Sequence, residues 1–287
     1  MTPIIHVEDL SFTYPGAQRP SVDGVSFAVQ RGEVFGLLGP SGAGKSTTQR
    51  LLTGQLSGYA GSARVFDVEM RDHGRSYFRR VGVGFELPNL FSKLTVRENL
   101  AFFAALSGGA RRDPLELLSK VGLEDAVDTR ASELSKGMKM RVNLCRALVH
   151  DPELVFLDEP TSGQDPATAR RVRALIRALK DEGKTVLLTT HNMQEAAELS
   201  DRVAFLVEGR VAVIDEPRRI MLSHSDRRVR VEYDDGGRIS SAELSLDRLT
   251  SDPGFLSHLA ERSVLSVHSL EASLDDVFIE VTGVELS

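Results

Sequence analysis

The chain has 287 residues, of which 41% are hydrophobic and 26% are charged, and its formal net charge at pH 7 is -6. These values predict a soluble globular protein with a sizeable core, built as two domains or as one large domain with an appendage. The acidic net charge argues against a nucleic-acid partner, and the single cysteine, Cys145, excludes an internal disulfide. The sequence contains no run of roughly 20 apolar residues, so we expect any membrane-spanning segment to belong to another chain.

Two half-buried strands are predicted near the N-terminus, because apolar and polar residues alternate over Ile4–Val7 and Val25–Val29. Between them, Tyr14 stands before Pro15 and Gly16, a pair that is typical of a turn. An aromatic ring beside a nucleotide site could stack on adenine. From the residues alone, packing of Tyr14 on the sheet is the simpler interpretation.

The next stretch, GPSGAGKST, has the pattern of a phosphate-binding loop. It follows the apolar run Val34–Leu38, a predicted buried strand, and precedes a predicted helix through Leu52. Its glycines allow successive N–H groups to face one anion, and the helix dipole favours negative charge there. Lys45 would reach the β- and γ-phosphates, and the Ser46 hydroxyl would bind magnesium. The residues expected to bind nucleotide are Gly39, Pro40, Ser41, Gly42, Ala43, Gly44, Lys45, Ser46 and Thr47.

Beyond this loop, Val81–Phe85 is a further predicted strand, which leads into Glu86 and ends before Pro88. From about residue 95 to residue 150, apolar residues recur at helical spacing. They predict a helical subdomain inserted between two parts of an α/β core. Thr95 and Glu98 form a capping-box pattern at its start, and Met138–Leu148 is its last predicted helix.

Two later strands are predicted to end in polar residues. Leu154–Glu159 reads LVFLDE, which indicates a buried parallel strand with Asp158 and Glu159 at its C-terminal edge. The strand Thr185–Leu188 is followed closely by His191. Ligands of open α/β sheets bind at this edge, so a functional role for His191 is favoured over a purely structural one.

The last part of the chain, residues 216–287, differs in character and carries no second phosphate-loop pattern. It is predicted to fold as a small α+β appendage. Two roles stay open for it: a structural tail that covers a sheet edge, or a surface that binds a partner.

Taken together, these motifs resemble an ATP-binding cassette (ABC) protein, the nucleotide-binding subunit of an ABC transporter, over about residues 4–215. Gly39–Thr47 matches Walker A and Leu154–Glu159 matches Walker B, while LSKGM (Leu134–Met138) stands at the signature position. SGQDP (Ser162–Pro166) resembles the D-loop and His191 the switch histidine. The resemblance implies a P-loop NTPase fold of ABC type, an α/β domain over 1–215 with a mixed sheet, the helical subdomain at about 95–150, and the appendage at 216–287.

The resemblance also implies residue roles. Tyr14 would stack on adenine, and two copies would bind head-to-tail with two ATP molecules between them. Ser135 and Gly137 of one copy would complete the γ-phosphate site of the other. Ser46, Asp158 and Glu86 would bind Mg²⁺. Glu159 would polarise water, His191 would steady the γ-phosphate and Lys45 would hold the phosphates, so that the protein is an ATPase.

Three positions depart from the family pattern. In the signature, Lys136 replaces a glycine and Met138 a glutamine, while Ser135 and Gly137 are kept. Glu86 stands where the family has the Q-loop glutamine, and its added negative charge predicts slower turnover or a stronger dependence on metal. Gln164 of the D-loop replaces an apolar residue.

The variant signature, Glu86 and the short tail LDDVFIEVTG resemble the ATPases of drug, antibiotic, lipid and polysaccharide exporters, which act at the cytoplasmic face of the membrane with a separate permease. The segment Leu87–Leu94 would then either meet that permease or be buried in the helical subdomain. The alternatives are a soluble ABC ATPase with a non-transport regulatory role, an importer ATPase, and a non-hydrolysing module. Neither the cargo nor the direction of transport follows from the sequence, although export is favoured.

Overall fold

The computed structural model describes residues 2–225, 228–261 and 263–284, so residues 226–227, 262 and 285–287 of the predicted appendage lie outside it. The described chain divides into two compact units, residues 2–216 and residues 217–284. In the described ranges, no helix combines the length and the apolarity that crossing a bilayer requires.

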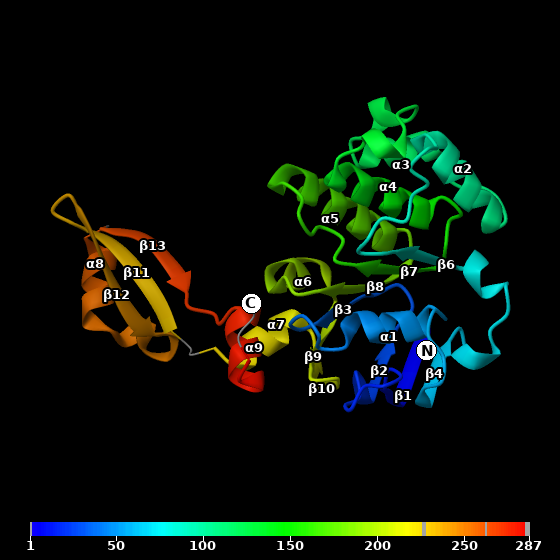
Figure 1. Cartoon of the computed structure of the whole chain (residues 1–287). Coiled ribbons are helices and arrows are strands. Elements are labelled where there is room, and N and C mark those ends of the chain that lie inside the picture. The colour runs from blue at the N-terminus through cyan, green and yellow to red at the C-terminus, as the bar shows by residue number, and fades with distance from the viewer. Residues whose placement is uncertain (1, 226–227, 262, 285–287) are drawn as a thin grey trace. The chain divides into compact units, whose positions relative to one another are not determined.

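The first unit is organised around a six-stranded sheet in the order β10-β9-β3-β8-β7-β6 (Figure 1). Its strands pair in parallel except β10, which forms an antiparallel hairpin with β9. Their bounds are β3 Val34–Leu38, β6 Val81–Gly84, β7 Leu154–Asp158, β8 Thr185–Thr190, β9 Arg202–Val207 and β10 Arg210–Asp215. Strands β3 and β8 are buried throughout, as parallel strands covered on both faces must be.

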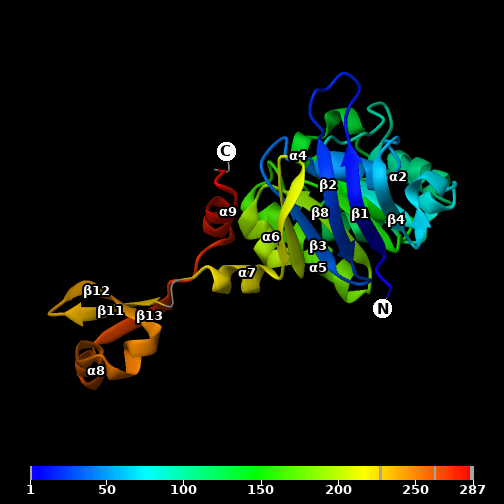
Figure 2. The same ribbon diagram turned by 90° about the horizontal axis from the view of Figure 1, so that it is seen from below.

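A second, antiparallel sheet packs against one face of the first and has the order β2-β1-β4-β5. Its strands are β1 Ile5–Phe12, β2 Val22–Val29, β4 Ala60–Val65 and β5 Val68–Glu69. Helix α1 (Lys45–Leu52) lies between the two sheets, and Figure 2 shows β1 and β2 in front of β3 and β8. Phe35 and Leu187 of the large sheet point into this core together with Leu51.

The opposite face of the six-stranded sheet carries helices α4 and α5, with the other helices of the helical subdomain beyond them (Figure 1). Val34, Val186 and Leu188 point to this side, as the two-residue period of a strand requires. The helices are α2 Val96–Leu106, α3 Pro114–Lys120, α4 Lys136–Leu148, α5 Pro166–Asp181 and α6 Met193–Leu199. The capping box at α2 is confirmed, and Cys145 is buried among these helices as a core residue.

The second unit contains a three-stranded antiparallel sheet in the order β12-β11-β13. Its elements are α7 Pro217–Ser223, β11 Arg228–Asp235, β12 Arg238–Ser245, α8 Pro253–Ala260, β13 Val264–Ser269 and α9 Leu274–Thr282. Strand β12 and helix α7 were not predicted from the sequence. Short 3₁₀ turns complete the chain at Met70–Asp72, Tyr77–Arg79, Glu124–Ala126, Ala131–Glu133 and Leu246–Ser251.

Candidate nucleotide site

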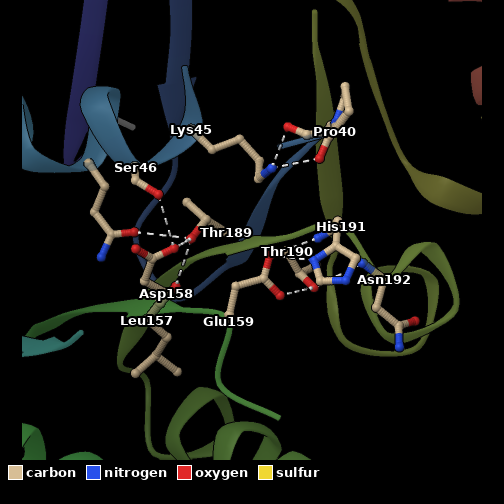
Figure 3. A network of polar contacts seen from close by, with 12 residues as sticks. Pro40, Lys45, Ser46, Leu157, Asp158, Glu159, Thr189, Thr190, His191 and Asn192 are labelled. Atoms are coloured by element: carbon tan, nitrogen blue, oxygen red, sulfur yellow. Dashed lines mark hydrogen bonds and ion pairs between the residues drawn. The ribbon is translucent and has the colours of Figure 1, made fainter. Parts of the chain in front are cut away.

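The C-terminal ends of β3, β7 and β8 meet at one edge of the six-stranded sheet and surround a cavity of about 370 Å³. The loop after β3, the carboxylates after β7 and the histidine after β8 therefore converge, as Figure 3 shows for their side chains. The lining residues are Ser21, Ser41, Gly42, Ala43, Gly44, Lys45, Ser46, Thr47, Glu86, Asp158, Glu159, Ser162 and His191.

The loop before α1 has the backbone of an anion site. Gly44 is the N-cap residue of α1 and has a φ of 104°, a left-handed value that favours glycine. A Cβ atom at Gly44 would lie 2.4 Å from the carbonyl oxygen of Ser21, so a side chain does not fit there. Among the described residues, no side chain caps α1. The N–H groups of its first turn are therefore available to a phosphate.

Lys45 is folded back over this loop. Its Nζ donates to the carbonyl oxygens of Gly39 (2.6 Å) and Pro40 (2.9 Å), as drawn in Figure 3. Burial lowers the pKa of the Lys45 ammonium, while the charges of Glu159, Asp158 and Glu86 oppose that shift. The three carboxylates thus favour the charged form of the lysine that is expected to meet the phosphates.

Asp158 lies at the centre of a hydroxyl cluster. Ser46 Oγ donates to Asp158 Oδ1 over 3.4 Å, and Thr189 Oγ1 donates to the same oxygen. The buried side chain of Gln49 contacts Thr189, with 3.3 Å between Oε1 and Oγ1. Mg²⁺ takes oxygen ligands and commonly uses one or two carboxylates together with substrate phosphates. The adjacent Ser46 and Asp158 oxygens fit that ion, with Glu86 on the wall of the same cavity.

Glu159 and His191 contact each other directly. His191 Nδ1 lies 2.8 Å from Glu159 Oε1, and the backbone N–H of His191 donates to that oxygen over 3.1 Å. Thr190 Oγ1 donates to the second carboxylate oxygen over 3.2 Å. Glu159 itself has a φ of 49°, a left-handed value uncommon for a residue with a side chain. This strained turn aims the carboxylate along the edge of the sheet toward His191.

Five of the expected site residues are not part of the cavity lining, namely Tyr14, Gly39, Pro40, Ser135 and Gly137. Gly39 and Pro40 contact Lys45 through their carbonyl oxygens. The Tyr14 hydroxyl is 3.3 Å from Thr47 Oγ1, and its ring packs edge-on against Phe12, so Tyr14 stands beside the loop. Ser135 is the N-cap residue of α4, where its Oγ accepts from the backbone N–H of Met138 over 3.2 Å. Ser135 is exposed and Gly137 is half-buried. One chain therefore does not bring the signature turn to its own phosphate loop.

Several other residues at this site were not predicted from the sequence. Gln49 and Thr189 belong to no motif singled out above, although Thr189 lies between a predicted strand and His191. Ser162 is the first residue of the D-loop match, but no site role was predicted for it. Glu195 is buried on α6. Burial raises the pKa of its carboxyl, against hydrogen bonds to Thr161 and Thr190 that lower it. The sequence of α6 did not indicate that the Glu195 side chain would be buried.

This site and fold define an ABC-type ATPase, and the chain belongs to the ABC transporter family as an ATP-binding subunit. A family model described as ABC transporter matches residues 22–162, and one described as fluoroquinolone efflux ABC transporter C-terminal domain matches residues 227–271. These matches confirm the resemblance and the P-loop fold expected from the sequence, together with ATPase activity as the class of reaction.

The chain is similar along its whole length to a fluoroquinolones export ATP-binding protein of Mycobacterium tuberculosis. The two are 54% identical over 287 residues, which is 100% of this chain and 95% of the relative. A Nod factor export ATP-binding protein I of Bradyrhizobium diazoefficiens is 39% identical over 92% of each chain.

Solved structures agree with this assignment. The structure of an ATP-binding subunit of an ABC transporter matches with a TM-score of 0.70 and 30% identity, over 77% of this chain and 92% of that one. A dimeric ATP-binding cassette in a post-hydrolysis state, bound to ADP and Pi, matches with a TM-score of 0.67 and 26% identity, over 74% and 98%.

Proposed function

We propose that this chain powers export of a drug or drug-like molecule through a separate membrane permease, acting at the cytoplasmic face of the membrane. The observation that carries the proposal is full-length similarity to export ATP-binding proteins, which includes the fluoroquinolone-efflux match in the C-terminal unit. A fluoroquinolone-type drug is therefore the first cargo to test. Residues 1–215 form the ATP-binding domain, and 216–287 form an appendage that contains the fluoroquinolone-efflux match.

The working form is a head-to-tail homodimer that holds two ATP molecules. Supporting this arrangement, Ser135 and Gly137 lie away from the cavity of their own chain, so a second copy must supply them. The matching post-hydrolysis cassette structure is itself dimeric. Tyr14 stacks on adenine from its position beside Thr47.

Hydrolysis depends on how the residues at the sheet edge are placed. The N–H groups of the Gly39–Thr47 loop and the Lys45 ammonium bind the phosphates. Ser46 and Asp158 hold Mg²⁺ with help from Glu86, and the ion neutralises phosphate charge when bound. Glu159 accepts a proton from a water, whose oxygen forms the new bond to the γ-phosphorus, and the proton then passes to the released phosphate. The bond from that phosphorus to the β,γ-bridging oxygen breaks, leaving ADP and phosphate, while His191 orients the γ-phosphate.

A surface of the helical subdomain faces the permease in this proposal. Leu87, Phe91 and Phe102 are large apolar side chains with 70%, 47% and 42% of their surface exposed. The rings of Phe91 and Phe102 pack edge-on with centroids 4.9 Å apart. Leu90, by contrast, packs against the core of the subdomain. An exposed aromatic cluster suits a helix of a membrane partner.

The proposal is tested in cells that express this chain with its permease. Efflux of a fluoroquinolone should stop with Lys45→Ala, since that variant loses a phosphate contact, while the matched variant Lys120→Ala, on α3, should transport normally. Drug accumulation with each variant, and ATP hydrolysis by the purified complex, are the measurements. If the wild-type complex hydrolyses ATP normally but does not export the drug, the proposed cargo is wrong. If the wild-type complex does not hydrolyse ATP, the proposed mechanism is wrong.

A further inference from the structure

Strand β6 has an unusual neighbour on its free side. It is the last strand of the six-stranded sheet, and it pairs with β7 along one side only. Carbonyl groups alternate in direction along a strand, and the Arg80 carbonyl, just before β6, accepts from the N–H groups of Glu153 and Leu154 at the start of β7. The carbonyls of Val81, Val83 and Phe85 therefore point to the free side.

Three side chains from α4 and its end satisfy these carbonyls in turn. Asn143 Nδ2 donates to Phe85 O over 2.7 Å, and Arg146 Nη2 donates to Val83 O over 2.9 Å. His150 Nε2 lies 3.0 Å from Val81 O, to which it can only donate. All three are buried. Steps of three and four residues on a helix advance about 4.5 Å and 6 Å, close to the roughly 6.6 Å that two residues of a strand span. We call Asn143, Arg146 and His150 the α4 ladder.

The backbone of α4 also lies directly on the strand. A Cβ atom at Gly82 would come within 2.1 Å of the Ala147 carbonyl oxygen, so only glycine permits this approach. Later residues of α4 contact earlier residues of β6, so the helix and the strand run antiparallel. The start of α4, which bears Ser135, therefore points the same way as the end of β6, from which Glu86 follows.

Arg146 extends the ladder toward the surface of the helical subdomain. Its guanidinium lies over the rings of Phe85 and Phe103, 5.3 Å and 4.6 Å from their centroids. Burial lowers the pKa of Arg146 to about 10, so the group stays charged at neutral pH. Phe103 in turn stacks on Phe91, at a centroid distance of 5.8 Å. A continuous line of contacts thus runs from the exposed aromatic cluster to the residue before Glu86.

From this geometry we infer that Asn143 and Arg146 are positioning residues, which fix the signature helix to the root of the Glu86 loop. The inference rests on the proposed dimeric ATPase. In that dimer, Ser135 serves the partner's ATP and Glu86 serves the chain's own ATP. A rigid tie between them makes the two sites respond together. His150, at the far end of the ladder, anchors the helix without reaching either site.

The test compares Asn143→Ala and Asn143→Asp with His150→Ala in the full-length chain. The aspartate keeps the shape of Asn143 but loses its donor, and His150→Ala removes an equivalent carbonyl contact far from Glu86. For both Asn143 variants we expect kcat to fall on the order of tenfold and the Hill coefficient for ATP to fall toward 1. The ATP dissociation constant should stay within about twofold, since the phosphate loop is untouched. His150→Ala should lower the melting temperature while keeping kcat and cooperativity.

Hydrogen exchange of the backbone amides at 86–91 gives a readout that is independent of activity. Asn143→Ala should speed exchange there and His150→Ala should not. Asn143→Ser, which keeps a shorter donor, replaces the alanine if that variant fails to fold. The inference would be overturned if the Asn143 variants kept the wild-type kcat and Hill coefficient. It would also be overturned if His150→Ala changed kcat and the Hill coefficient as much as the Asn143 variants do. Absence of hydrolysis in the wild type would reject the proposed function instead, and the exchange comparison would still decide on the ladder.

Discussion

His191 Nδ1 lies 2.8 Å from Oε1 of Glu159. The histidine proposed to contact the γ-phosphate therefore contacts the glutamate proposed as the base. The backbone N–H of His191 reaches the same oxygen, and the hydroxyl of Thr190 reaches the other. A carboxylate fixed by three donors is placed for its water before ATP arrives. Such preorganisation lowers the barrier to phosphoryl transfer more than added flexibility would.

Glu159→Gln should abolish hydrolysis while keeping ATP bound. The amide keeps the size of the carboxylate but is a far weaker base, so phosphate release should fall on the order of 100-fold or more. ATP should then accumulate in a dimer, which light scattering after gel filtration would detect. The control, Glu116→Gln, changes an exposed carboxylate that pairs with Lys120 on α3, and it should behave as wild type. Hydrolysis at the parent rate would show that Glu159 is not the base.

Glu86→Gln should change the metal requirement. Glu86 lines the cavity together with Asp158 and Glu159, and all three charges act on Lys45. Removing one negative charge should tighten metal-free ATP binding by a few-fold, and should raise the Mg²⁺ concentration at half-maximal hydrolysis. A Mg²⁺ titration of phosphate release measures the second effect. Glu86→Asp keeps the charge and should stay nearer the wild type; an unchanged titration in Glu86→Gln would remove Glu86 from the metal site.

Gly82→Ala should destabilise the fold. Its Cβ atom would lie 2.1 Å from the Ala147 carbonyl oxygen, so α4 has to move away from β6 at a cost of about 1–3 kcal/mol or more. At Gly74, by contrast, a Cβ atom meets no described atom within 4 Å beyond its chain neighbours. Gly74→Ala is therefore the matched control and should keep its urea midpoint. Equal midpoints for the two variants would contradict the close contact.

The buried Glu195 predicts a pH dependence. Burial raises its pKa above the usual 4.5, so the folded protein binds this proton more tightly than the unfolded chain. Stability is then lost as pH rises from the unfolded value through the raised folded value. Glu195→Gln cannot ionise. Its urea midpoint relative to the wild type should therefore be higher at pH 8 than at pH 5, with Glu116→Gln showing no such gain. The same relative midpoint at both pH values would mean that folding does not raise the pKa of Glu195.

Phe91→Glu should break the complex with the permease. A charge in the exposed aromatic cluster cannot enter an apolar interface, so co-purification should fall at least tenfold while the isolated chain still hydrolyses ATP. Leu115→Glu, on the exposed side of α3, changes an apolar side chain of similar exposure and should leave the complex intact. Normal assembly and transport in Phe91→Glu would reject this docking surface.

Much of the first unit could be predicted because its signals are local. Alternation over Val25–Val29 identifies β2, but the strand starts at Val22, where Asp23 and Gly24 interrupt the pattern. The Thr95–Glu98 capping box fixes the start of α2. By contrast, β12 reads RISSAELS, with serine, glutamate and alanine in place of β-branched residues. Pairing with β11 decides its conformation, and the sequence of β12 alone does not show that partner.

The candidate site likewise contains some residues that the sequence predicts and others that it does not. Gly39–Thr47 and Leu154–Glu159 are contiguous motifs, so the sequence places them at one sheet edge. The contact between Asn143 and the Phe85 carbonyl joins residues 58 positions apart and belongs to neither motif. Arg146 is buried against the rings of Phe85 and Phe103, and it too belongs to no motif. Such contacts depend on how α4 lies on β6, which helical periodicity does not specify.

The large sheet separates the chain's two cores, with α1 on one face and α4 on the other. In the proposed dimer, this partition keeps the ATP-holding half and the ATP-completing half of one molecule permanently apart. A single subunit can therefore bind ATP but cannot hydrolyse it. The architecture of the subunit therefore prevents hydrolysis until a second copy is in place.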